Sequence, residues 1–243
     1  VVAFQVWVKV GSADEAPEEV GLAHLHEHML FKGTGRRGLG EIARSIEAHG
    51  GEINAWTSFD QTVYHVVMAS RHARQGLDVL ADAVRNSSFD AGELTREIEV
   101  VCEEIKRSLD MPSRRASKAL FGEAFKTHPY GRPVIGFEAD VRAHTRDRVL
   151  AFYGKHYQPS NMVLSAVGDF DEPTLRAQVE ELFGGEWARA PRPAFARPPE
   201  ADFKGVRVTL ARDEVKDAHL HLAFQIPGVE HADTAALDVL AML

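Results

Sequence analysis

Alternation of apolar and polar residues predicts several β-strands in this chain. The opening segment alternates from residue 4 to residue 10, and further strand patterns run from 52 to 57 and from 62 to 69. Only the short connection Ser58-Phe59-Asp60-Gln61 separates the second segment from the third. A fourth strand is predicted at 162–167. The predicted strands thus fall in three separate parts of the sequence.

Helical spacing of apolar residues fills most of the sequence between these strands. The first predicted helix runs from about Val20 to Phe31 and ends at Gly33 and Gly35, because glycine readily adopts the left-handed backbone angles that terminate helices. A longer helix is predicted from Asp90 to Asp110, with Asp90 as its N-terminal cap and Pro112 beyond its end. Further helices are predicted at 39–49, 73–84, 113–127, 137–156 and 173–183.

The composition is that of a globular protein, and it limits the possible partners. The 243 residues, 44% apolar and 26% charged, are enough to bury a core. The net charge of −8 argues against nucleic acid as a partner, because nucleic-acid-binding surfaces are normally basic. A single cysteine, Cys102, excludes an internal disulfide framework, so we expect packing alone to stabilise the fold.

No apolar run is long enough to predict a membrane span, and the opening segment lacks the pattern of a secretion signal. We expect a soluble protein, cytoplasmic or periplasmic if its source is bacterial. The sequence opens inside a strand pattern and closes inside an apolar helical run, so we also expect it to be part of a longer protein.

The first predicted helix carries the arrangement H-x-x-E-H. His24 and His28 are four residues apart and therefore lie on the same face of a helix, where two imidazoles can bind one metal ion. Glu27 lies on the neighbouring stripe, where a carboxylate can act beside an open coordination position. His26 points to another side of the helix, and we expect it not to be a ligand.

A catalytic zinc site needs a third protein ligand, and the acidic helix after Asp90 offers two candidates. Glu97 and Glu104 are seven residues apart, so they share a stripe but are separated by roughly 10 Å and cannot both bind one ion. We assign Glu104 as the ligand and Glu97 as an outer acceptor that orients a ligand or a water. Taken alone, an acid-rich helix is more often a solvated surface, so this assignment depends on the histidine motif.

A proline-rich stretch at residues 188–202 predicts a semi-rigid linker between two domains. Beyond it, residues 219–228 alternate like the opening strand, and an acid-containing turn and an apolar helix follow. Alignment of Met242-Leu243 with Met29-Leu30 puts three other residues at the positions of the motif: Leu237, Leu240 and Ala241 in place of His24, Glu27 and His28. We therefore expect a zinc-binding domain at 1–190, a linker at 191–202, and the truncated start of a second, metal-free homologous domain at 203–243.

Several segments together resemble one known family. The run GLAHLHEHMLFKGTGRRG is similar to the signature of the pitrilysin, insulysin and mitochondrial processing peptidase family of inverted-zincin endopeptidases. That family places a glutamate ligand about 76 residues after the second histidine, and here 104 − 28 = 76. It also places a second glutamate seven residues earlier, as Glu97 stands to Glu104. Three further segments are similar in the same order: GGEINAWTSFDQTVYH, HPYGRPVIG and YQPSNMVLSAVGDF.

The resemblance implies an α+β fold, in which a mainly antiparallel sheet packs against helices in two layers and the unit is repeated in tandem. It implies one Zn2+ per chain, held by His24, His28 and Glu104, with Glu27 as the catalytic base. It further implies that the strand around Asn54, Ala55, Trp56 and Thr57 is an edge that pairs with an extended peptide substrate. The alternative for this strand is ordinary core sheet.

The function that we expect is zinc-dependent hydrolysis of peptide bonds in extended peptides or unfolded segments. Zinc lowers the pKa of a bound water to about 7, and Glu27 takes the proton as the water attacks the peptide carbonyl. The resemblance implies that a C-terminal half or a partner subunit closes a chamber and supplies an arginine and a tyrosine. A homodimer is also possible, and we expect the chain alone to be poorly active.

Two other functions remain open from the sequence. Some relatives are non-catalytic assembly subunits, although these tend to lose part of the metal motif, which is complete here. A lyase resembling the S-ribosylhomocysteine lyases would use a cysteine ligand, and Cys102 lies about 200° around its helix from Glu104, a poor position for one. We expect Cys102 to be a small core residue instead.

Overall fold

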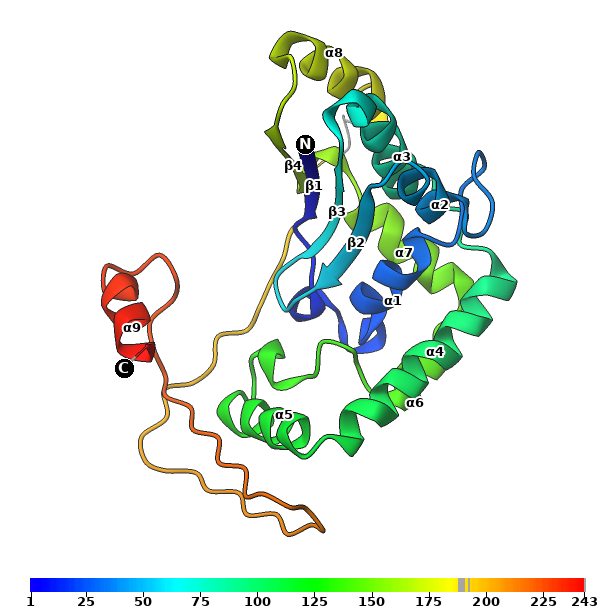
Figure 1. Cartoon of the computed structure of the whole chain (residues 1–243). Coiled ribbons are helices and arrows are strands. Elements are labelled where there is room, and N and C mark those ends of the chain that lie inside the picture. Colours follow the sequence, from blue (N-terminus) through cyan, green and yellow to red (C-terminus); the bar gives the residue numbers. More distant parts are fainter. Residues whose placement is uncertain (188–190, 192, 243) are drawn as a thin grey trace.

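The computed structural model describes residues 1–187, 191 and 193–242, and it has the predicted α+β architecture. Its described strands and most of its helices lie within the first 183 residues, and one further helix follows near the end (Figure 1). The strands are β1 (Val2–Val8), β2 (Glu52–Thr57), β3 (Thr62–Met68) and β4 (Met162–Gly168). The helices are α1 (Leu22–Leu30), α2 (Glu41–Glu47), α3 (Ala73–Asn86), α4 (Ala91–Asp110), α5 (Pro112–Ala124), α6 (Glu138–Arg142), α7 (Arg146–His156), α8 (Glu172–Phe183) and α9 (Thr234–Ala241).

The four described strands form one antiparallel sheet in the order β2-β3-β1-β4. Among them, β2 is an edge strand that pairs only with β3. The first strand begins and ends two residues earlier than predicted. It stops at Val8 because Val8 pairs with Thr62 and Met162, the first residues of both neighbouring strands, so no ladder continues beyond it.

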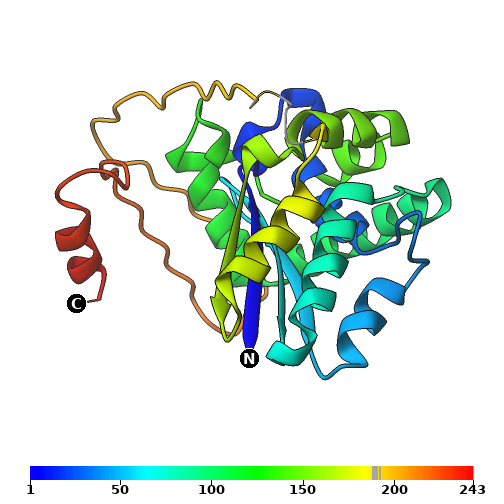
Figure 2. The same cartoon turned by 90° about the horizontal axis from the view of Figure 1, so that it is seen from above.

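The helices cover one face of the sheet and the other face stays largely open, which makes the unit two-layered (Figures 1 and 2). Alternate residues of β1 point into the helical layer and are fully buried: Val2, Phe4, Val6 and Val8. The opposite face exposes apolar side chains at its two edges, with Trp56 37% exposed on β2 and Val163 65% exposed on β4. None of the described helices is both long enough and apolar enough to cross a bilayer.

The N-terminus of helix α1 is capped by a buried carboxyl group from outside the helix. Glu15 lies in the acidic turn before the helix, is 5% exposed, and accepts hydrogen bonds from the backbone N–H groups of Gly21 (2.9 Å) and Ala23 (2.8 Å). These N–H groups have no partner within a helix, and the two carboxyl oxygens of Glu15 satisfy them, while burial raises the pKa of this group to about 8. Gly21 has φ 91°, and a Cβ there would come within 2.9 Å of Val141. The start of the histidine helix is thus fixed by long-range contacts.

Two expectations for the chain beyond β3 differ from the structure. The single helix predicted over residues 137–156 is divided into α6 and α7, because Thr145 leaves helical geometry and caps α7 with its side chain. Residues 219–228 form no strand, since no described strand pairs with them, and an extended segment without ladder partners is not a sheet element. Their apolar side chains are exposed; Leu220 and Phe224 are each 82% accessible.

The described part of the predicted linker is anchored on the first unit before the chain runs away from the sheet (Figure 2). Arg197 forms ion pairs with Asp14 (2.7 Å) and with Asp60 in the β2–β3 turn. Glu200 accepts hydrogen bonds from the backbone N–H groups of Thr127 and His128. The predicted domain boundary at 190–191 touches residues 188–190, which, like residues 192 and 243, lie outside the described part of the chain.

The cap on α1 leads to a stability prediction. Glu15→Ala leaves the N–H groups of Gly21 and Ala23 buried without an acceptor, so we expect the free energy of unfolding to fall by about 2–4 kcal/mol. Urea denaturation measures the change. Glu18→Ala, in the same turn but exposed, is the matched control and should shift stability by less than about 0.5 kcal/mol. Equal effects of the two substitutions would contradict a capping role for Glu15.

Candidate metal centre

Helix α1 presents the three polar residues of the H-x-x-E-H motif on its one accessible side. Its other residues are buried against the sheet and the neighbouring helices, including Leu25 and Met29 with no exposed surface. His24, Glu27 and His28 are the three positions of α1 that remain partly exposed. Packing of the apolar stripe therefore determines where these three side chains point.

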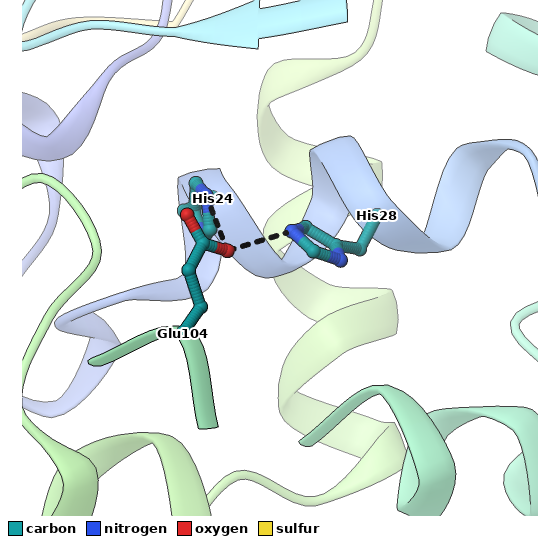
Figure 3. Close-up of side chains that lie close together, drawn as sticks. All are labelled: His24, His28 and Glu104. Carbon is teal, nitrogen blue, oxygen red and sulfur yellow. Dashed lines mark ion pairs between the residues drawn. The ribbon is translucent and has the colours of Figure 1, made fainter. Parts of the chain in front are cut away.

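Helix α4 packs against α1 and brings Glu104 to the two histidines. The Glu104 Oε2 atom lies 3.8 Å from His24 Nε2 and 3.6 Å from His28 Nε2 (Figure 3). One ligand atom from each of the three residues lies within 4.8 Å of the others. Ligand atoms of a tetrahedral zinc ion are roughly 3.3 Å apart, given bond lengths near 2.0–2.1 Å. Two imidazoles and one carboxylate at these distances fit a zinc ion that keeps one position for solvent or substrate.

The charges of the cluster favour a cation among these groups. Burial lowers the pKa of His28, but the nearby carboxylates of Glu104 and Glu97 outweigh burial and raise it to about 9. Burial and the neighbouring His28 lower the pKa of His24 to about 4, so that this ring is neutral with a free lone pair. The neighbouring His28 ring, 3.6 Å away, lowers the pKa of Glu104. The same carboxylates that favour a proton on His28 favour a divalent ion bound to both rings.

Glu97 contacts the far side of the His28 ring. Its Oε2 atom lies 3.1 Å from His28 Nδ1, and its side chain is 7% exposed. An Nδ1–H that donates to this carboxylate leaves the Nε2 lone pair directed at the cluster. Glu97 and Glu104 thus occupy opposite sides of the same ring, as expected for residues two helical turns apart on α4.

Glu27 lies beside the cluster without joining it. Its Oε2 accepts a 2.5 Å hydrogen bond from the Thr57 hydroxyl, which holds the carboxylate at the end of the edge strand β2. Burial raises the pKa of Glu27, and the hydrogen bond from Thr57 partly opposes this. The sequence predicts Thr57 only as part of a substrate-binding strand. Its contact with Glu27 could not be recognised there, because the two residues are 30 positions apart.

The four residues expected to bind substrate alternate across β2. Ala55 and Thr57 point toward the helical layer, whereas Asn54 and Trp56 lie on the open face. The Trp56 ring packs edge-on against Trp7, with ring centroids 5.8 Å apart. The strand is an edge of the sheet, and its outer backbone groups have no partner strand in the described part of the chain.

A groove of about 400 Å3 opens directly over the candidate metal centre. Its lining includes His24, Glu104 and Thr57, together with residues of α5 and loop residues 131–135. A larger cavity of about 560 Å3, lined in part by loop residues 125–129 and linker residues 194–196, contains none of the three candidate ligands. Of these two hollows, the smaller one is lined by candidate ligands, His24 and Glu104.

The two residues that were not expected to be ligands lie in the core. His26 is fully buried, with Nδ1 2.7 Å from the Leu22 carbonyl oxygen and Nε2 2.9 Å from that of Val149. Cys102 is also buried, and it is not among the residues of the candidate centre. Both residues contribute to packing rather than to the site.

Family models match most of the chain. Residues 1–138 match the model described as insulinase (peptidase family M16), and residues 143–243 match the peptidase M16 inactive domain. The first match covers the candidate ligands His24, His28 and Glu104 together with Glu27. The second begins before α7 and β4, which pack in the same layers as the first match.

Individual relatives agree with these models. The chain is 36% identical over 236 residues to an uncharacterized zinc protease of Mycobacterium tuberculosis, which covers 97% of this chain and 54% of the relative. It is 33% identical over 237 residues to a probable mitochondrial-processing peptidase subunit beta of Arabidopsis thaliana, covering 97% of the chain and 44% of the relative. The chain therefore spans about half the length of the curated relatives that it matches.

A solved structure shares the fold. A protease from Helicobacter pylori superimposes with a TM-score of 0.74 at 29% identity, over 81% of this chain and 49% of that one. Sequence, fold and family models agree with the expected resemblance to inverted-zincin endopeptidases. The chain belongs to the insulinase family of peptidases, family M16.

Proposed function

We propose that this chain is the zinc-binding part of an endopeptidase that hydrolyses peptide bonds in extended peptides or unfolded protein segments. The observation that carries the proposal is the convergence of His24, His28 and Glu104 from two helices, with ligand atoms within 4.8 Å of one another. Supporting it, relatives are named zinc proteases. Three protein ligands with one free position are the arrangement of catalytic rather than structural zinc.

Each residue has a distinct role in the proposed reaction. His24, His28 and Glu104 would hold one zinc ion, which when bound supplies Lewis acidity toward a water molecule and the substrate carbonyl. Glu27 takes a proton from the attacking water at its carboxylate and returns it to the leaving amine. Thr57 orients Glu27 through its hydroxyl, and Glu97 orients the His28 ring through Nδ1.

Strand β2 is the proposed binding surface for the peptide backbone. An edge strand donates and accepts main-chain hydrogen bonds without regard to the partner's side chains, so it binds extended segments of varied sequence. Thr57, at the end of β2, contacts Glu27, so a peptide paired with Asn54, Ala55, Trp56 and Thr57 passes the candidate metal centre. Substrate affinity would then come from backbone pairing and specificity from the groove.

The rest of the catalytic chamber is proposed to come from a second half, in the same polypeptide or in a partner subunit. The chain spans about half of its relatives, and its last hundred residues match the M16 inactive domain. We keep 1–190 as the zinc-binding domain, 191–202 as the linker and 203–243 as the start of a metal-free domain. A homodimer is a further arrangement, and weak turnover by the 243 residues alone is part of this proposal.

A non-catalytic assembly role is the second candidate, and the observation that bears on it is that one relative is named as a subunit, that of a probable mitochondrial-processing peptidase. An assembly subunit does not need a bound metal, so the zinc content of the purified chain discriminates between the two. A lyase with a cysteine ligand has no support in the geometry, because Cys102 lies apart from the candidate centre.

The ligand assignment is tested by zinc binding. Glu104→Gln removes the anionic ligand from α4, and we expect zinc affinity, measured by competition with a chromophoric chelator, to fall by more than about 100-fold, since loss of an outer-shell partner alone typically costs 10- to 100-fold. Glu103→Gln, on the adjacent exposed position, is the matched control. If the chain binds zinc equally with both substitutions, Glu104 is not a ligand.

The assignment of the base is tested by separating binding from turnover. Glu27→Gln keeps the shape of the side chain but cannot accept a proton, so kcat/KM for a fluorogenic peptide should fall by at least about 100-fold, as for loss of a general base. The assay uses the protein with its second half, and Glu103→Gln serves as control. Zinc content should remain at one ion per chain. Cleavage at the parental rate by the zinc-loaded variant would refute this role.

A further inference from the structure

Lys32 extends the contacts of the candidate metal centre by one more residue. Its ammonium Nζ lies 2.7 Å from Glu97 Oε1, while the other oxygen of the same carboxylate, Oε2, lies 3.1 Å from His28 Nδ1. Each oxygen of Glu97 therefore has one cationic or N–H partner. The contacts thus connect Lys32 to Glu97 and Glu97 to His28.

Glu97, the middle residue of these contacts, is buried enough that loss of one partner would cost free energy. Glu97 is 7% exposed at its side chain, whereas Lys32 is 30% exposed. A buried carboxylate that loses a charged partner must find water or another donor, and it rotates to do so. Rotation of Glu97 would move Oε2 away from His28 Nδ1 and release the ring.

The backbone keeps Lys32 in place for this contact. Its N–H donates to the Met29 carbonyl oxygen at 3.0 Å, which continues the turn at the end of α1. Lys32 lies two residues beyond the end of α1, and both its ammonium and the His28 ring contact Glu97, so the two side chains lie on the same side. The ammonium thus reaches Glu97 from the turn that follows the helix carrying His28.

His28 depends on this support more than His24 does. Within the described part of the chain, the buried Nδ1 atom of His24 has no hydrogen-bond partner. The orientation of His24 is set by packing, whereas that of His28 is set by Glu97. A residue that fixes Glu97 therefore acts on one of the two candidate imidazole ligands.

We propose that Lys32 is a positioning residue for the metal centre, which pins the Glu97 carboxylate and thereby fixes the ring and the tautomer of His28 for metal binding. This inference rests on the proposed zinc site, but it concerns a residue that would touch neither the ion nor the substrate. The effects of the two residues on zinc affinity should therefore be coupled. Lys32 should affect zinc affinity only while the Glu97 carboxylate can accept a hydrogen bond from His28 Nδ1.

A double-mutant cycle with zinc as the probe tests the coupling. We expect Lys32→Met to weaken zinc affinity about 10-fold and Glu97→Gln about 10- to 100-fold, in the range for outer-shell partners. The double variant should bind zinc no more weakly than Glu97→Gln alone, because the two residues act in series. Lys32→Arg keeps the charge and should recover most of the affinity. Lys106→Met, which breaks an exposed ion pair on α4, is the matched control.

A second readout separates positioning from general stability. In the zinc-loaded chain, the 15N NMR spectrum should show the parental His28 ring protonated at Nδ1, and Lys32→Met should speed exchange of that proton with water. The proposal would be overturned if the losses of zinc affinity in the double-mutant cycle were additive, or if Lys32→Met left the exchange rate of the His28 Nδ1 proton unchanged. If Lys32→Met does not fold, Lys32→Gln replaces it in both experiments. A parental chain that binds no zinc would instead refute the proposed function itself.

Discussion

The packing of α1 against α4 is the contact on which the candidate site depends. Neither helix carries a complete ligand set, since α1 supplies two imidazoles and α4 supplies the carboxylate of Glu104. The apolar residues of both helices are buried in the same core, so their polar stripes meet at a defined distance. A shift of one helix by a single residue, about 1.5 Å along its axis, would move Glu104 relative to both rings. The hydrophobic layer therefore determines the coordination geometry.

The contact between α1 and α4 brings several carboxylates together, and their negative charge needs a balancing cation. Three carboxylates, those of Glu27, Glu97 and Glu104, surround two imidazoles in a partly buried region. Lys32 neutralises one of them from the outer side, and a proton or a metal ion must balance the others. Each carboxylate contacts a different partner, so the three side chains occupy separate positions around the two rings. Thr57 holds Glu27, Lys32 holds Glu97, and the two rings face Glu104.

Local pattern was enough to predict most of the elements and the arrangement of the motif residues. The four-residue spacing of His24 and His28 and the seven-residue spacing of Glu97 and Glu104 place side chains on helix faces, because helical geometry is regular. The residues that support the site were not predictable in this way. Glu15 caps α1 from a preceding turn, and Lys32 meets Glu97 across 65 positions of sequence. Both contacts depend on tertiary packing, which leaves no periodic signal.

The difference between local periodicity and tertiary packing also explains which predicted elements were wrong. The ends of β1 are determined by the ends of its two neighbours, which periodicity within β1 does not contain. The alternation at 219–228 fits a strand but supplies no partner for one, and a strand requires both. A similar limit applies to the substrate surface. Alternation identifies β2 as a strand, whereas its position at the edge of the sheet, next to Glu27, is a property of the whole fold.

The most direct test of the central claim is a crystal structure of the zinc-loaded protein, with diffraction data collected on both sides of the zinc absorption edge. We expect one anomalous peak per chain, bonded to Nε2 of His24, Nε2 of His28 and a carboxylate oxygen of Glu104 at about 2.0–2.2 Å. Glu27 should lie beside the remaining coordination position without bonding to the ion. A peak located elsewhere, or a zinc ion bound by the histidines while Glu104 points away, would contradict it.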